Sequence, residues 1–324
     1  MHNLNICSLN VRGIKNRINR RALFKTIKSY GFDITAMQET YINEVGIKQI
    51  EKELRGVVHS ASCVGRSKGL ITHFSSKIKS ENVTLLETTD RLIISKVKQN
   101  GIEYFVINVY APCIEHDKLL FYNFLEETIK QYVKSDQFGN IICMGDFNCV
   151  VNNSLDIISG KKHSDRTVHA FNNFIKHLNL RDKCREYNAD SKVFTWNNKD
   201  FSSARRLDYI FTGVNFDKYN LKPEIKNLPF TDHKAVTLDI KFKNFERGAG
   251  IFKIDSCFFT DTNYKKIIID TINDIKNSYS HLNDGLIWEL IKVHIKEKSI
   301  KYAKLKQKVT NEKDKSNRRE LSII

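Results

Sequence analysis

Two kinds of hydrophobic pattern alternate along residues 1–243. Short, mostly apolar runs, such as residues 4–11 and 34–38, are typical of buried strands. Between these two runs, apolar residues recur at helical spacing over residues 23–30, and Gly31 stands where a helix would end. The same patterns predict further strands at residues 69–74, 91–97, 104–109, 140–144, 206–211 and 235–242, and further helices at 119–133 and 168–178. This alternation predicts an α/β domain rather than an all-helical or all-β one.

The pattern changes near Asn244. Strand-like alternation stops after about Phe259, and isoleucines at helical spacing follow over residues 267–275. From Leu290 to Arg319 the chain has eleven Lys or Arg against three acidic residues. The sequence therefore predicts two parts: a domain at residues 1–243 and a basic, mainly helical extension at residues 244–324.

Charge and composition narrow the class of protein. The chain has 53 Lys and Arg against 37 Asp and Glu, a formal net charge of +16 that favours polyanionic partners such as nucleic acid. Its seven cysteines include no C-x-x-C, which argues against a zinc or disulfide framework and for a reducing, intracellular compartment. No apolar run approaches the roughly 18–20 residues of a membrane span, so we expect a soluble protein without a membrane partner.

Polar side chains stand at the ends of the predicted strands. Asn10 follows the first run, Glu39 the second, and Asp146 and Asn148 the run at residues 140–144, while Asp232 and His233 immediately precede the run that begins at Ala235. In α/β proteins the loops at strand ends converge to form sites, so these side chains are expected to meet.

Asp208 lies inside an otherwise apolar strand. A buried carboxylate is costly without a partner, and a histidine is the natural candidate, because an Asp fixes the imidazole tautomer and raises the basicity of the other ring nitrogen. The carboxylate and amide oxygens, without clustered Cys or His, suit Mg²⁺ or Mn²⁺ rather than zinc. The inferred chemistry is metal-assisted hydrolysis of a phosphate ester.

Six short motifs appear in the order of a known superfamily. They are Leu9-Asn-Val-Arg-Gly13, Gln38-Glu-Thr40, Asn108-Val-Tyr-Ala-Pro112, Gly145-Asp-Phe-Asn148, Leu207-Asp-Tyr209 and Thr231-Asp-His233. The chain resembles the endonuclease/exonuclease/phosphatase superfamily, and within it the apurinic-type endonuclease domain of non-LTR (long interspersed element) retrotransposon polyproteins. The resemblance covers residues 3 to about 242. It implies a two-sheet α/β sandwich flanked by helices, with the site at one end, a packing that hydrophobic periodicity does not give.

The resemblance also implies roles for single residues. Glu39 would bind the metal with Asn10 and Asp232 nearby, and Asp208 would orient His233 toward the scissile phosphate. Asp146 would position or deprotonate the attacking water, and Asn148 and Tyr110 would stabilise the phosphate by hydrogen bonds. The residues similar to DNA-binding positions are Thr195, Trp196, Arg205, Arg206 and Thr231, the last standing where a Ser is common.

The expected function is a divalent-metal-dependent DNA endonuclease that nicks one strand and leaves a 3′-hydroxyl able to prime reverse transcription. Such an enzyme would work in the nucleus on genomic DNA, or otherwise in the cytoplasm. Two alternatives stay open: a phosphatase acting on inositol phosphates or lipid head groups, and a non-catalytic nucleic-acid-binding remnant. The basic tail resembles the segment that precedes a reverse transcriptase, where element RNA is a candidate partner, but no Tyr-x-Asp-Asp signature follows; a truncated copy or a fragment is expected.

Each residue also has an ordinary structural interpretation. Asp146 and Asn148 would then form an Asx turn, and Asp208 with His233 would be a pair that stabilises a sheet edge. Tyr110 and Trp196 would pack in the core, and the basic residues between Arg12 and Lys28 would form a solvated helix face rather than a DNA contact.

Overall fold

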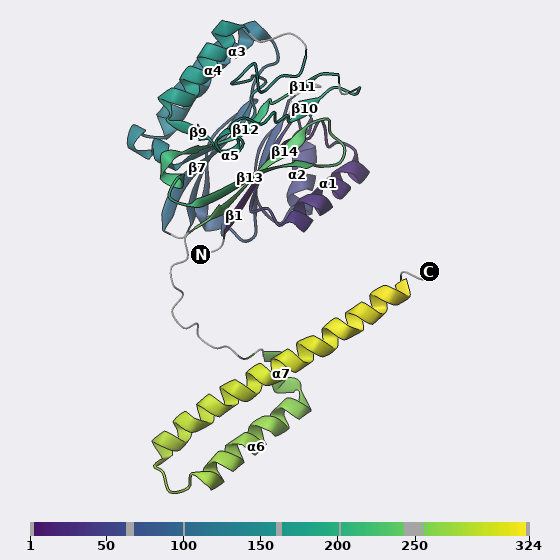
Figure 1. Ribbon diagram of the computed structural model, residues 1–324, viewed down its shortest axis with the longest axis vertical. Coiled ribbons are helices and arrows are strands. Elements are labelled where there is room, and N and C mark those ends of the chain that lie inside the picture. The colour runs from purple at the N-terminus through teal and green to yellow at the C-terminus, as the bar shows by residue number, and fades with distance from the viewer. Residues whose placement is uncertain are drawn as a thin grey trace. The chain divides into compact units, whose positions relative to one another are not determined.

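The computed structural model describes residues 3–62, 68–99, 101–159, 164–200, 202–242, 254 and 256–321. The chain divides into two compact units, Met1–Phe245 and Glu246–Ile324. Strands and helices alternate in the first unit, and the second is helical (Figure 1). The beginning of the predicted extension, residues 244–253 and 255, lies outside the described residues.

Two mixed sheets form the first unit. The first sheet has the strand order β13 (Asn220–Asn227), β14 (Lys234–Lys241), β1 (Leu4–Asn10), β2 (Ile34–Gln38), β4 (Leu70–Ser75) and β3 (Gly56–Ala61). The second has the order β5 (Val83–Thr89), β6 (Leu92–Gln99), β7 (Ile102–Tyr110), β8 (Ile141–Asp146), β12 (Asp208–Gly213) and β9 (Leu180–Asp182). β1 pairs in parallel with β2, and β7 with β8, while β14 and β12 run antiparallel to β1 and β8. A short hairpin, β10 (Trp196–Asn197) with β11 (Ala204–Arg205), lies outside both sheets.

Alternate residues of the central strands explain why the sheets stack. In β8, Ile142 and Met144 join a cluster with Ile6 of β1 and Leu238 of β14, which is the core between the two sheets. Because side chains alternate along a strand, Cys143 of the same strand faces the opposite way. Both faces of β8 are therefore buried, which is why its sequence reads as a continuous apolar run.

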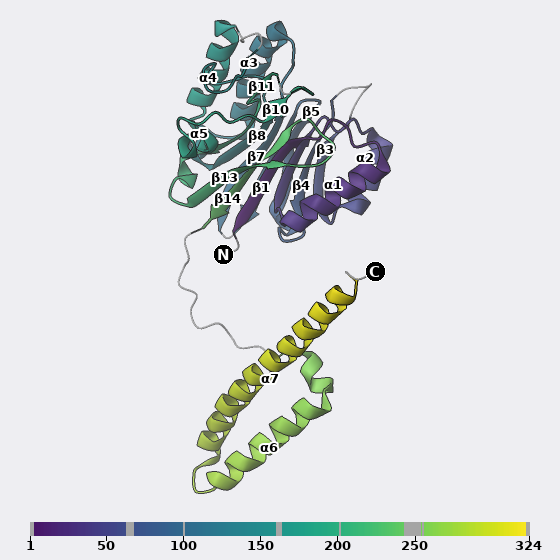
Figure 2. The same cartoon turned by 45° about the vertical axis from the view of Figure 1, so that its right-hand side comes forward.

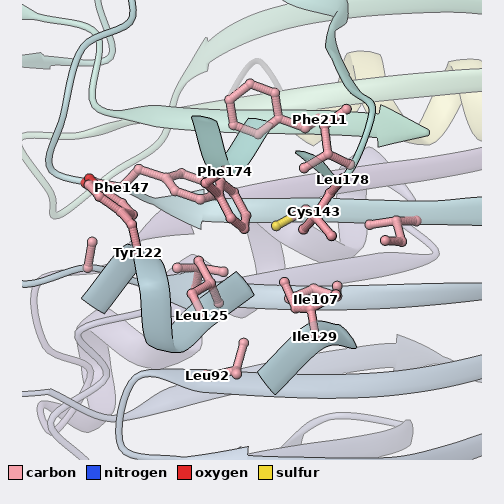
Figure 3. Packing of buried hydrophobic residues seen from close by; sticks show 14 of the residues in the cluster. Leu92, Ile107, Tyr122, Leu125, Ile129, Cys143, Phe147, Phe174, Leu178 and Phe211 are labelled. Carbon is pink, nitrogen blue, oxygen red and sulfur yellow. The ribbon is translucent and has the colours of Figure 1, made fainter. Parts of the chain in front are cut away.

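Helices cover the outer face of each sheet (Figure 2). α1 (Arg17–Tyr30) and α2 (Glu44–Glu53) pack on the first sheet, where Leu23 and Phe24 meet Leu9. α3 (Glu115–Tyr132) and α4 (Asp165–His177) pack on the second. Figure 3 shows this second contact, with Tyr122, Leu125 and Phe174 lying near Cys143 and Phe147. The predicted two-sheet sandwich flanked by helices is confirmed.

The elements that the hydrophobic pattern missed are short or lie at edges. β3, β5, β9, β13, the β10–β11 hairpin, α2 and the five-residue α5 (Lys183–Tyr187) were not predicted. β13 carries Pro223 and, among the described strands, pairs with β14 alone; a proline is tolerated in such an edge strand because it has no N–H to donate. Its burial is mixed, so it lacks the apolar run of a central strand.

The second unit confirms the predicted helical extension. α6 (Thr262–Ser278) and α7 (Asp284–Leu321) pack against each other, and Tyr264, Ile275, Ile291 and Tyr302 are buried. The hydroxyls of Tyr264 and Ser299 are 2.7 Å apart, which ties the two helices together. None of the described helices is long and apolar enough to cross a membrane.

Candidate active site

Strand ends from both sheets meet at one edge of the sandwich. β1 ends at Asn10 and β2 just before Glu39, while β14 begins immediately after His233. In the second sheet, Asp208 at the start of β12 is paired in register with Asp146 at the end of β8. The antiparallel strands therefore start where the parallel strands end, and residues far apart in the sequence lie close together.

Asp146, Asp208 and His233 form the centre of this edge. One ligand atom from each lies within 4.8 Å of the others. The Nδ1 atom of His233 is 2.9 Å from Oδ2 of Asp208, an ion-pair geometry that orients the ring and leaves Nε2 for another partner. The two carboxylates are nearly fully buried, and His233 is 8% exposed.

Burial and the charges of neighbouring side chains shift the pKa values of Asp146 and His233. Burial and the charge of Asp208 raise the pKa of Asp146 above its usual range. Burial alone would lower the pKa of His233, but the neighbouring carboxylates, Asp208 first, outweigh it and raise the pKa to about 10. At neutral pH the imidazole is therefore a cation held between carboxylates.

Glu39 lies beside this group and is held on both oxygens. Its Oε1 accepts hydrogen bonds from Asn10 Nδ2 at 2.9 Å and from the Tyr110 hydroxyl at 2.8 Å. Its Oε2 accepts from the hydroxyl of Tyr41. Asn10 Nδ2 also donates to Asp146 Oδ2 at 2.9 Å, so one amide links the two carboxylates. Burial and the nearby charge of Glu39 raise the pKa of Tyr110, which keeps its hydroxyl protonated.

Sequence reasoning missed Tyr41. It directly follows the Gln38-Glu-Thr40 motif, and this position could have marked it as a candidate site residue. The hydrophobic pattern does not show, however, that its side chain turns back onto Glu39.

Asp232 and Asn148 have hydrogen-bond partners within the protein that the sequence did not indicate. Oδ2 of Asp232 accepts hydrogen bonds from the Arg12 guanidinium and from Trp196 Nε1, the latter at 3.1 Å. Asn148 uses its backbone N–H to hold Asp146 Oδ1 at 2.9 Å, and its side-chain amide donates to the carbonyl of Ala111. Both residues nevertheless line the same cavity as Glu39 and His233.

The cavity at this edge has a volume of about 600 Å³. Its walls combine carboxylates with cations and aromatic rings: Arg12, Glu39, Tyr41, Cys113, Asp146, Asn148, Trp196, Ser203, Arg205, Leu207, Asp232 and His233. The cavity wall thus brings three carboxylates together with two arginines and a histidine, a combination that suits a phosphate approaching a bound cation.

The backbone around the cavity is strained at several non-glycine residues. Arg12, Glu39, Tyr41 and Asn148 line the cavity and have φ values of 46°, 53°, 55° and 49°. Left-handed conformations of this kind cost about 1–3 kcal/mol each and persist where the surrounding structure enforces them, commonly at functional sites.

Two of the predicted DNA contacts, Arg206 and Thr195, are buried in the structure. Arg206 is 1% exposed, and its guanidinium bonds Asp156 and Asp182. Thr195 is fully buried, and its hydroxyl accepts from the backbone N–H groups of Leu207 and Asp208. Both side chains bond to other protein groups, and neither is among the residues that line the cavity, so their contact with DNA stays a prediction.

The other three predicted contacts have different positions. Trp196 and Arg205 line the cavity. The Thr231 hydroxyl donates to the Asn10 carbonyl at 2.7 Å and accepts from the His233 backbone N–H at 3.1 Å. Thr231 therefore joins the loop of His233 to the end of β1.

Comparisons with known proteins agree with this geometry. No family model matches the chain. The "Transposon TX1 uncharacterized 149 kDa protein" of Xenopus laevis is 24% identical over 93% of the chain, which spans 23% of that protein's length. The endonuclease domain of TRAS1, a telomere-specific non-LTR retrotransposon, superposes with a TM-score of 0.55 at 14% identity, covering 74% of this chain and 100% of that domain. The AP endonuclease LMAP from Leishmania major gives 0.63 at 13% identity, covering 74% and 88%.

The chain has the endonuclease/exonuclease/phosphatase fold. The predicted resemblance to this superfamily and to retrotransposon endonucleases is confirmed. In this fold the six motifs named above supply Asn10, Glu39, Tyr110, Asp146, Asp208 and His233, which the structure brings to one edge of the sandwich.

The residues present fit a divalent cation, which this fold family implies. Among the described residues, Asp208 Oδ1 and Asp232 Oδ1 are buried and have no hydrogen-bond partner. A buried anionic oxygen without a donor is costly, and a bound cation would satisfy it. The available donors, Glu39, Asp146, Asp208 and Asp232, are hard oxygens of the kind that Mg²⁺ and Mn²⁺ prefer.

Proposed function

We propose that this protein is a divalent-metal-dependent DNA endonuclease that hydrolyses one phosphodiester of a duplex and leaves a 3′-hydroxyl. The observation that carries the proposal is the group of Asp146, Asp208 and His233, within 4.8 Å of one another, two of which, Asp146 and His233, line a cavity together with Arg12 and Arg205. The net charge of +16 favours a polyanionic substrate. The similarity to a retrotransposon endonuclease and to an AP endonuclease supports DNA as that substrate.

The mechanism assigns each residue a step. Asp146, whose pKa is raised by burial and by Asp208, accepts a proton from the attacking water. The water oxygen bonds to phosphorus while the P–O3′ bond breaks, giving a 5′-phosphate and a 3′-oxygen that takes a proton from solvent water, and Asp146 then returns its proton to solvent. Protonated His233, held by Asp208, donates from Nε2 to a phosphate oxygen as negative charge develops. Glu39, with Asn10 and Asp232 nearby, would hold Mg²⁺ or Mn²⁺, which supplies positive charge to the phosphate.

A plasmid-nicking assay tests this proposal. The full chain with Mg²⁺ is expected to convert supercoiled plasmid to the open-circular form, and EDTA is expected to stop the reaction. The His233→Ala protein should nick at least about a hundredfold more slowly, because it lacks the preorganised donor. His169→Ala, which removes an exposed histidine on α4, serves as the matched control and should nick like the parent.

Two results would overturn the proposal. One is a parent protein that binds the plasmid but leaves it supercoiled in Mg²⁺. The other is a His233→Ala protein that nicks as fast as the parent, which would assign the activity to something other than this site.

A further inference from the structure

Glu39 is held by a residue that the proposed mechanism does not use. Its Oε1 is fixed from one side by Asn10 and Tyr110, and its Oε2 accepts from the Tyr41 hydroxyl. Among the described residues, Tyr41 is the only hydrogen-bond donor to Oε2. Without it, the carboxylate would keep its Oε1 contacts but would be free to turn Oε2 away.

The backbone around Tyr41 is fixed by two neighbouring segments. The N–H groups of Thr40 and Tyr41 donate to the carbonyls of Gly69 and Lys68, each at 3.0 Å. The Gly13 N–H donates to the Glu39 carbonyl at 2.7 Å. These bonds hold Glu39 and Tyr41 in left-handed conformations, which a free chain would avoid.

The ring of Tyr41 packs on a glycine that leaves room for it. Gly13 has a φ of 93°, and a Cβ at that position would lie 2.8 Å from Cδ2 of Tyr41. The close approach of ring and backbone therefore requires Gly13. The Tyr41 side chain is thus positioned by contacts on its backbone, its ring and its hydroxyl.

We propose that Tyr41 is a positioning residue that fixes the Glu39 carboxylate for divalent-cation binding. The inference rests on the proposed function, because it takes Glu39 as a ligand of Mg²⁺ or Mn²⁺. A carboxylate held on both oxygens loses little freedom when it binds a cation, whereas one that rotates must be ordered first. Loss of such an outer contact typically weakens metal affinity by about 10–100-fold.

Direct Mn²⁺ binding to the full chain tests this inference. Titrations followed by the electron paramagnetic resonance signal of free Mn²⁺ compare the parent, Tyr41→Phe and Tyr132→Phe. Tyr132 is the matched control, because its hydroxyl also bonds a glutamate, Glu87, but outside the cavity. We expect Tyr41→Phe to bind Mn²⁺ about tenfold or more weakly, Tyr132→Phe to bind like the parent, and the thermal midpoint of metal-free Tyr41→Phe to stay within a few degrees of the parent.

The outcomes separate the inference from the proposed function. Equal Mn²⁺ affinity in the parent and Tyr41→Phe overturns the role of Tyr41, whatever the nicking assay shows. A parent that binds Mn²⁺ but does not nick DNA overturns the proposed activity and leaves the Tyr41 comparison decisive. A parent that binds no Mn²⁺ at millimolar concentration overturns both.

Discussion

Arg205 and Arg206 are adjacent in the chain but differ in their surroundings. Arg205 ends β11 and lines the cavity. Arg206 is buried, and its Nε donates to Asp156 Oδ1 at 2.9 Å while its Nη1 lies 2.7 Å from Asp182. The resemblance predicted both as DNA contacts, and the sequence does not show which of two adjacent arginines pairs with a buried carboxylate.

Substituting the two arginines one at a time separates an effect on DNA affinity from an effect on protein stability. Arg205→Ala should weaken DNA binding and lower the salt slope of binding by about one, because one phosphate contact is lost. Arg206→Lys should leave DNA affinity unchanged but lower the free energy of unfolding by about 1–3 kcal/mol, because lysine cannot make the forked contact with Asp156. Fluorescence anisotropy in EDTA, at several salt concentrations, measures the affinity, and urea denaturation measures stability. An Arg206→Lys protein that loses as much affinity as Arg205→Ala would refute the assignment.

Strands that are buried on both faces could be predicted from the sequence, and strands at the edges could not. β1, β2, β7 and β8 are buried on both faces, so their apolar runs predicted them closely. The edge strand β13 and the two-residue strands of the hairpin carry no such run and were missed. The stacking of the two sheets came from the resemblance alone, because periodicity does not say which face of a strand meets which partner.

Gly145 shows why one motif residue is a glycine. β8 continues past the predicted end at residue 144 to Asp146, and Gly145 lies opposite Val109 of β7. A Cβ at Gly145 would lie 1.9 Å from the Val109 carbonyl oxygen. Because Gly145 has no side chain, β7 and β8 can approach each other closely, and this places Asp146 at the site.

Gly145→Ala is therefore expected to destabilise the protein by about 3 kcal/mol, since the backbone must move apart. Gly101→Ala is the control for the loss of a positive-φ glycine, because a Cβ there meets nothing within 4 Å. Urea denaturation compares the two. A Gly145→Ala protein as stable as Gly101→Ala would show that the close approach of β7 and β8 is not required.

At the scale of the whole first unit, the site depends on both sheets. Asn10, Glu39 and His233 come from the ends of the first sheet, and Asp146 and Asp208 from the second. The position of polar residues at strand ends predicted all of these except Asp208, which stood out as a carboxylate inside an apolar strand. Their pairing was harder to predict: the contacts of Asp232 with Arg12 and Trp196, and of Tyr41 with Glu39, depend on side-chain directions that spacing does not encode.

In the proposed mechanism, Asp208 and His233 act as one unit on the substrate. Groups that act together in catalysis show strongly non-additive losses, whereas independent groups multiply their effects. The decisive measurement is the single-turnover rate of duplex cleavage by Asp208→Asn, His233→Ala and the double variant, at saturating Mg²⁺. If the two residues act as one unit, the double variant cleaves no more than a few-fold more slowly than the slower single variant. A double variant whose loss equals the product of the two single losses would contradict it.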